Sequence, residues 1–188
     1  IARSVTERDE ILDLMLAHDG VHLDYEDCIG VTYDDVRRDP DAALSTIVAR
    51  FKAVEAQCDA VVIVGSDYTD VGSPAELGYN ARIAANLGAP VLLVLSGRAG
   101  QGENLGSSTA RTPAEMGQIT SLALTELSHG RAGLFAVVAN RADPERSGEI
   151  VEAIREVVEG SSPSDRSVPI WALPEDRFLI APSVRGVM

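Results

Sequence analysis

An apolar run that ends in aspartates is the first feature of the sequence that could support chemistry. Residues 61–70 read VVIVGSDYTD, so aliphatic side chains are followed by Asp67 and Asp70. Open α/β sheets bind ligands beyond the carboxyl ends of their strands, where carboxylates can hold a metal ion. The alternative is that the two aspartates satisfy turn amides or cap the next helix.

A second candidate site is the stretch ANRAD, residues 139–143, which also ends an apolar run. An amide and a carboxylate at the end of a strand can read the edge of a nucleotide base through hydrogen bonds. Asn140 could equally cap a turn, and Asp143 with Pro144 could start the next helix. The residues alone leave these alternatives open: Asn140, Asp143 and Asp67 are candidate nucleotide-binding residues, Asp67 is also the metal candidate, and no residue is assigned a catalytic role.

The printed sequence contains no phosphate loop to accompany such a site. A Walker A loop needs Gly, four residues, Gly, Lys and then Ser or Thr, so that backbone amides and the lysine hold the phosphates. The nearest approach runs from Gly97 to Gly102 and continues with Glu103, whose charge would repel phosphate. The three histidines show no metal-ligand spacing, and no serine lies in a nucleophile elbow.

The segments that must position these residues alternate between helix and strand. A capping residue followed by proline predicts helices that begin at Asp39, Ser73 and Thr112, and glycines predict the ends of the last two at Gly88 and Gly130. Two further helices are expected over 6–16, capped by Ser4 or Thr6, and over 147–158.

Short apolar runs between the helices predict the strands, over 60–64, 90–95, 134–139 and 168–173. These runs are nearly continuous, which is typical of strands that are buried on both faces. Alternation of strand and helix favours right-handed crossovers and a parallel sheet. The fold class expected is α/β, a three-layer parallel sheet with helices on both faces, in one domain over residues 1–188.

Composition excludes several classes of protein. The net charge of -13 argues against a nucleic-acid partner and against an anionic membrane surface. No apolar run approaches the roughly 18 residues of a membrane helix. The two cysteines, Cys28 and Cys58, are expected to be buried free thiols in a reduced, cytoplasmic setting.

Three stretches, in their order and spacing, resemble one family. DAVVIVGSDYTD, NARIAANLGAPVLLV and PEDRFLIAPSV together are similar to the N-terminal domain of long, multidomain bacterial phosphate acetyltransferases. That domain is of P-loop type and resembles dethiobiotin synthetase and the cobyrinate diamide synthases. The resemblance covers essentially the whole chain.

The resemblance implies a regulatory and assembly domain in a homo-oligomeric enzyme. Its first strand and phosphate loop would lie upstream of Ile1, so the chain is expected to be a fragment. Acetyl transfer from acetyl-CoA to phosphate would be carried out by a C-terminal transacetylase domain of the same chain. ATP and magnesium would be the ligands of an intact domain, and the fragment alone would not be catalytic.

One departure from the family pattern concerns magnesium. ATP-using relatives carry Val-Glu-Gly at the end of the strand that matches residues 59–64, and here Val64 stands where that glutamate would hold the metal. Asn140 does match the position that contacts adenine in the synthetases.

The alternative function is an ATP-dependent ligase of the dethiobiotin or cobyrinate synthase class, which would need an activating lysine. Lys52 is the only lysine and is expected to face solvent, mid-helix. The third possible function is that of a binding module, an α/β domain unrelated to nucleotide-binding proteins.

Overall fold

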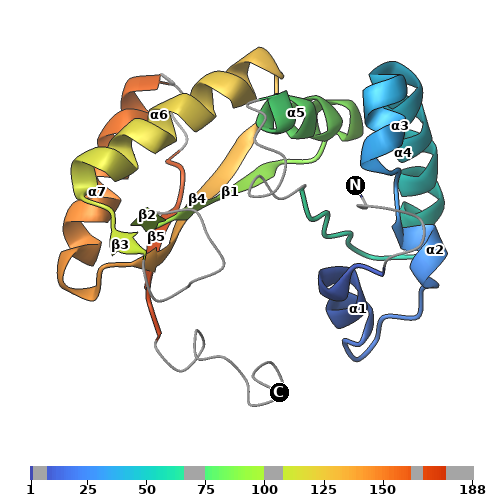
Figure 1. Ribbon diagram of the computed structural model, residues 1–188, viewed down its shortest axis with the longest axis horizontal. Coiled ribbons are helices and arrows are strands. Elements are labelled where there is room, and N and C mark those ends of the chain that lie inside the picture. Colours follow the sequence, from blue (N-terminus) through green and yellow to red (C-terminus); the bar gives the residue numbers. More distant parts are fainter. Residues whose placement is uncertain (2–7, 66–74, 100–107, 162–166, 177–188) are drawn as a thin grey trace. The chain divides into compact units, whose positions relative to one another are not determined.

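The computed structural model describes residues 1, 8–65, 75–99, 108–161 and 167–176. The chain divides into two compact units, Ile1–Gly88 and Ala89–Met188, and each is described by itself. Figure 1 shows helices in the first unit, and a sheet with its own helices in the second.

The described part of the first unit is helical. Its elements are α1 (Glu10–Leu16), α2 (Tyr25–Cys28), α3 (Tyr33–Arg38), α4 (Pro40–Glu55) and α5 (Ala75–Leu87). The predicted start of α4 is confirmed, because the Asp39 carboxylate accepts hydrogen bonds from the amides of Asp41 and Ala42 at 3.2 and 3.0 Å. The predicted end of α5 is also confirmed, with Gly88 at φ 64°, a conformation that favours glycine.

The expected start of the first helix is wrong. The helix begins at Glu10, because the Asp9 carboxylate accepts hydrogen bonds from the amides of Ile11 and Leu12 at 2.9 and 3.1 Å. The expected caps Ser4 and Thr6 lie outside the described residues, as does the expected cap of α5, Ser73.

The strand expected over 60–64 is the main error in the sequence-based prediction of the fold. The structure assigns no strand there, and the side chains of Val62, Ile63 and Val64 are 75%, 45% and 49% exposed. A buried strand needs a hydrogen-bonded neighbouring strand. The described residues of the first unit contain no strand with which residues 60–64 could pair. An apolar run therefore did not suffice to predict a strand.

The acid-rich stretch between residues 19 and 41 contains the two short helices that the sequence analysis did not predict. Thr32 and Asp35 form a capping box at the start of α3, in which the Asp35 amide donates to Thr32 Oγ1 at 3.3 Å and the Thr32 amide donates to Asp35 at 3.1 Å. The Thr-x-x-Asp pattern of Thr32 and Asp35 could have predicted the start of α3 from the sequence.

A small aliphatic core joins α4 and α5 to the segment before α3. It consists of Val31, Ala43, Ile47 and Ile83. At its edge, Arg82 forms an ion pair with Asp41 at 2.7 Å, and the Tyr79 hydroxyl donates to the carbonyl of Pro40 at 3.0 Å.

The second unit contains the sheet. Its elements are β1 (Val91–Ser96), β2 (Arg98–Ala99), β3 (Thr109–Ala110), α6 (Pro113–His129), β4 (Leu134–Ala142), the short 3-10 helix η2 (Pro144–Arg146), α7 (Ser147–Ser161) and β5 (Ile170–Pro174). The three strands expected here are confirmed as β1, β4 and β5. They pair in parallel in the order β1-β4-β5, as the α/β prediction required, while β2 and β3 form a small antiparallel ribbon.

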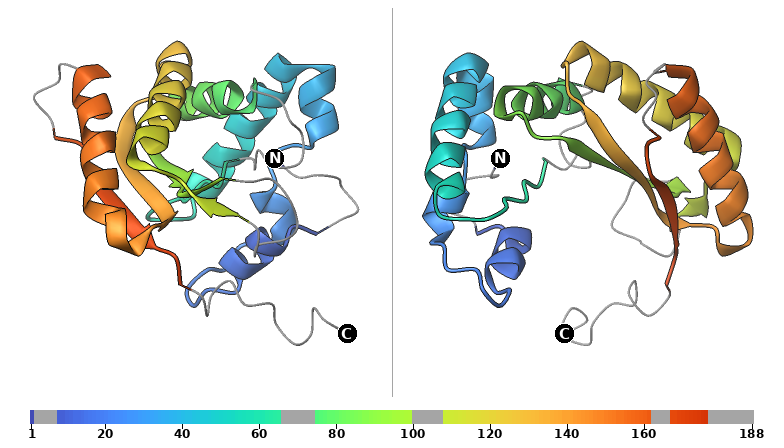
Figure 2. Two further views of the ribbon diagram at one scale, coloured as in Figure 1. Left: turned by 60° about the vertical axis from the view of Figure 1, so that its left-hand side comes forward. Right: turned by 180° about the vertical axis from the view of Figure 1, so that it is seen from behind.

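Helices α6 and α7 lie side by side along one face of this sheet (Figures 1 and 2). Leu93 and Leu95 of β1 are buried, whereas the alternate residues Leu92 and Val94 are 51% and 55% exposed. Within the second unit, the described helices therefore cover one face, although the sequence pattern had suggested burial of both faces.

The core between the sheet and its helices is formed by side chains of α6, α7 and β4. Met116, Ile150, Ile154 and Val137 are fully buried, as is Thr120, whose hydroxyl donates to the carbonyl of Met116 at 2.7 Å. The predicted N-terminus of α6 is confirmed as a Thr112–Glu115 capping box with Pro113 in the first turn. No helix in the described part of the chain is both long enough and apolar enough to span a membrane.

Candidate functional site at the carboxyl ends of the strands

The parallel register brings residues from three strands together at one edge of the sheet. Ser96 of β1 pairs with Asn140 of β4, and Asn140 pairs with Leu173 of β5. The Gly97 amide donates to the carbonyl of Asn140 at 2.6 Å, which holds the chain after β1 against β4. This is the edge at which open α/β sheets bind ligands.

Asn140 is exposed at this edge and lies within β4, two residues before its end, whereas the sequence analysis expected it just after the strand. Its Oδ1 accepts a hydrogen bond from the Arg141 amide at 3.0 Å, so the side-chain orientation is fixed by its own neighbour. Among the described residues, the side-chain amide nitrogen has no hydrogen-bond partner and remains able to donate to a ligand. A role in reading a nucleotide base stays a prediction.

Asp143 lies in the turn after β4. Its carboxylate accepts a hydrogen bond from the Glu145 amide at 3.0 Å and begins η2, with Pro144 in the first turn. This is the helix-starting arrangement that the sequence analysis had left open as the alternative. A role in base recognition would use the remaining lone pairs of this carboxylate and stays a prediction.

Magnesium does not fit the described residues at the position where the resemblance would place it. Val64 carries an aliphatic side chain, whereas magnesium requires oxygen ligands. Asp67 and Asp70 lie outside the described residues. Among the residues that are described, no group of three or more histidine, cysteine or acidic side chains is arranged to hold a metal ion.

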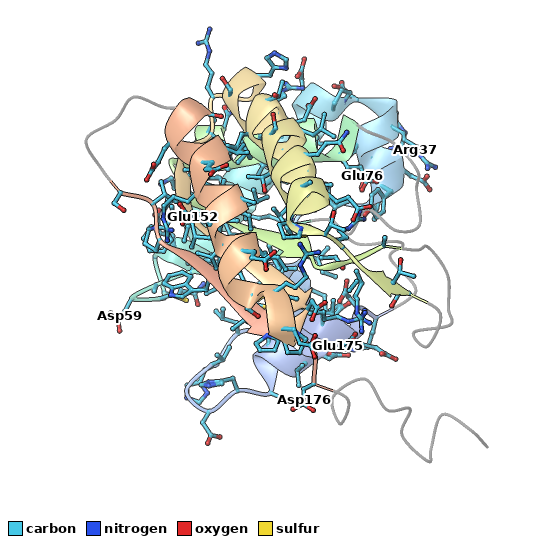
Figure 3. All side chains as sticks on the ribbon, turned by 90° about the vertical axis from the view of Figure 1, so that its left-hand side faces the viewer. Arg37, Asp59, Glu76, Glu152, Glu175 and Asp176 are labelled. Atoms are coloured by element: carbon cyan, nitrogen blue, oxygen red, sulfur yellow. The ribbon has the colours of Figure 1, made fainter. Side chains whose placement is uncertain are left out.

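A buried ion-pair cluster lies beside Asn140 and was not predicted from the sequence. Glu175, which follows β5, is ion-paired with Arg98 and with Arg141, the latter at 2.6 Å. The Glu175 side chain is 8% exposed and each arginine side chain is 25% exposed. Figure 3 shows Glu175 and Asp176 together where β5 ends.

The backbone around this cluster is tightly constrained. Arg141 has φ 56°, the left-handed region that costs a residue with a Cβ about 1 kcal/mol or more. A Cβ on Gly97 would come within 2.7 Å of the Arg141 carbonyl oxygen and of the Ala142 Cα. Arg111 donates from its backbone amide to the Gly97 carbonyl at 2.8 Å and from Nε to the Arg98 carbonyl at 3.1 Å. These contacts fix where Arg98 and Arg141 present their guanidinium groups.

The comparison with protein families identifies the domain. A family model described as an AAA domain matches residues 22–169, which is most of the chain. The chain belongs to this AAA domain family. The P-loop NTPase-like α/β class expected from the resemblance is therefore confirmed.

Curated relatives of this AAA domain chain are much longer than the chain itself. It is 29% identical to phosphate acetyltransferase from Nitratidesulfovibrio vulgaris (strain Hildenborough) over 192 aligned residues, which cover 98% of the chain and 25% of that relative. It is 26% identical to phosphate acetyltransferase from Synechocystis sp. (strain PCC 6803) over 148 residues, or 79% of the chain and 19% of that relative. The chain thus spans about a quarter or less of these relatives. No solved structure matches it.

Proposed function

We propose that this chain is the N-terminal regulatory and assembly domain of a phosphate acetyltransferase. The reaction, in which phosphate takes the acetyl group of acetyl-CoA to give acetyl phosphate and CoA, is assigned to a C-terminal transacetylase domain of the same polypeptide. One observation carries the proposal: similarity to a phosphate acetyltransferase extends over 98% of the chain but only 25% of that relative. Most of such an enzyme's length is then available for a separate catalytic region.

The proposal is tested by assaying the chain alone. The purified chain is mixed with acetyl-CoA and phosphate, and the loss of thioester absorbance is followed, with the full-length protein as the positive control. The readout avoids thiol reagents because Cys28 and Cys58 are free. We expect turnover from the full-length protein and none from the chain. Turnover by the chain alone would place the catalytic groups within residues 1–188 and overturn the proposal.

A degenerate nucleotide sensor is the form of regulation that the strand-end edge supports. Asn140 presents an amide that can donate to a base, and it lies at the edge where related folds bind nucleotides. ATP at one hundred times its dissociation constant stabilises a protein by about 2.7 kcal/mol. For a domain of this size, that corresponds to a rise in melting temperature on the order of 5–10 °C.

The sensor proposal is tested by melting the full-length protein with and without ATP, in the presence and absence of magnesium. We expect ATP to raise the melting temperature and the Asn140→Ala variant to lose that rise. An equal rise in the variant would remove Asn140 from base recognition. No rise in either protein at millimolar ATP would contradict nucleotide sensing and leave the assembly role to be tested separately.

The ligase alternative finds no support at the residue it would need. Lys52 is 62% exposed and forms an ion pair with Glu55, one turn along α4, at 2.7 Å. The expectation that this lysine faces solvent is confirmed. A lysine that activates a substrate needs a desolvated or phosphate-facing position, which Lys52 does not have.

A further inference from the structure

The cluster of Arg98, Arg141 and Glu175 has the composition of an anion site that is filled by the protein's own carboxylate. Arg141 donates to Glu175 Oε1 from Nε at 2.9 Å and from Nη2 at 2.6 Å, and Arg98 is ion-paired with Oε2. Each of the two carboxylate oxygens thus faces one guanidinium group. Pairs of arginines bind phosphates and carboxylate ligands with the same geometry.

One feature shows that Glu175 does not fully satisfy Arg98. Arg98 Nε is buried and has no hydrogen-bond partner among the described residues, although a buried donor without a partner is costly. Arg111 lies next to Arg98, because its Nε donates to the Arg98 carbonyl at 3.1 Å.

The ion pairs are not the only attachment of β5 at this edge. The Glu175 amide donates to the carbonyl of Ala142 at 3.1 Å, so the backbone of the segment is held to β4 independently of the side chain. The Glu175 carboxylate can therefore leave the arginines without breaking the pairing of the strands. Its replacement by a ligand would expose a charged side chain where β5 ends.

We propose that Arg98 and Arg141 form a binding site for a small oxyanion, either a phosphate or a carboxylate group of a metabolite, and that Glu175 occupies this site when the ligand is absent. The proposal goes beyond the regulatory role proposed above, because it needs neither a nucleotide base nor a neighbouring transacetylase domain. It gives the domain an anion-responsive element at the end of its last described strand.

Trp171 provides the signal for a direct test. It is the only tryptophan of the chain, it lies on β5 four residues before Glu175, and it is 49% exposed. Its emission is followed during titration with sodium phosphate and, separately, with sodium acetate, while sodium chloride keeps the ionic strength constant. Binding of phosphate alone, of acetate alone or of both supports the site and identifies which chemistry it takes. No response to either anion at millimolar concentrations, in the wild-type chain and in Glu175→Gln, overturns it.

Substitutions distinguish an anion site from a purely structural ion pair. Glu175→Gln removes the internal competitor, so we expect it to bind the anion about tenfold more tightly than the wild type. Arg98→Gln and Arg141→Gln should lose binding. Arg155→Gln is the matched control, since Arg155 is paired with Glu152 on the exposed surface of α7, where Figure 3 shows Glu152. An equal loss of binding in this control would overturn the assignment.

The double variant Arg141→Gln/Glu175→Gln guards against unfolding of the single arginine variants. It removes one charge of each sign, so no buried carboxylate is left with a reduced set of partners. Its fold is checked by circular dichroism before titration. We expect it not to bind phosphate or acetate. Binding as tight as that of Glu175→Gln would overturn the role of Arg141.

Discussion

Glu175 accepts two hydrogen bonds from the guanidinium group of Arg141, from Nε at 2.9 Å and from Nη2 at 2.6 Å. Both reach the same carboxylate oxygen, which leaves the other oxygen to Arg98. The contact joins the end of β4 to the end of β5, and the Glu175 side chain is 8% exposed. Arg141 is thus both the neighbour of Asn140 and one of the residues that tie Glu175, just after β5, to the rest of the sheet.

Replacement of Arg141 should destabilise the fold. Arg141→Ala leaves the buried Glu175 carboxylate with one partner fewer, which costs about 3 kcal/mol in the free energy of unfolding. Urea denaturation of the chain measures this change. Arg155→Ala is the control, because the exposed pair that it breaks is worth less than about 1 kcal/mol. Equal losses in the two variants would show that Arg141 has no special structural role.

Gly97 should not tolerate even one added methyl group. A Cβ at this position would lie 2.7 Å from two backbone atoms, the Arg141 oxygen and the Ala142 Cα, neither of which can move without disturbing β4. We expect Gly97→Ala to lower the free energy of unfolding by about 1–3 kcal/mol. Gly148→Ala is the control, since nothing lies within 4 Å of a Cβ there. In helix α7 it should stabilise by about 0.5–1 kcal/mol, and a similar gain at Gly97 would contradict the close approach.

The capping box of α6 should make stability depend on pH. Hydrogen bonds from the Thr112 amide and then from its hydroxyl hold the pKa of Glu115 below its ordinary value of 4.5. The unfolded chain therefore binds the proton more readily than the folded one. The contribution of this carboxylate is fully present above the ordinary pKa and is lost as the pH falls through the lower, folded value. Melting temperatures of the wild type and Glu115→Gln should differ at pH 7 and converge in acid; a difference independent of pH would contradict this.

The Cys28 thiol should react slowly. Partial burial, followed by the neighbouring Asp27, raises its pKa above the ordinary value of 9.0. In a Cys58→Ser variant, Cys28 is the only thiol, and its rate of alkylation by iodoacetamide can be followed as the pH is raised. We expect the midpoint of the rate to lie above pH 9.0. A midpoint near neutral pH would mean that Cys28 is an activated thiol.

Local signals explain what the sequence predicted correctly about the fold. The starts of α4 and α6 follow from a capping side chain and a proline, and both are short-range effects. The run at 60–64 was misread because apolar content does not provide strand partners, and these were missing in the described part of its unit. The short helix α3 was missed although Thr32 and Asp35 have the spacing of a capping box.

The candidate site was only partly predictable. Asn140 was expected just after a strand over 134–139, whereas β4 continues to Ala142, so Asn140 lies within the strand near its carboxyl end. The contact between Arg141 and Glu175 spans 34 positions of sequence, and no local pattern predicts it. Nor does arginine favour the left-handed backbone that Arg141 adopts. The one available signal was Glu175 itself, which lies in the stretch PEDRFLIAPSV that carries the family resemblance.

The central claim is that this chain regulates or assembles a phosphate acetyltransferase whose chemistry lies elsewhere in the polypeptide. The most direct measurement compares the full-length protein with a version that lacks residues 1–188, for the rate of acetyl phosphate formation and for subunit number by analytical ultracentrifugation. We predict that the shortened protein keeps turnover but changes its assembly state or its response to small-molecule anions. Complete loss of turnover in a shortened protein that remains folded, or no change in any of these properties, would contradict the claim.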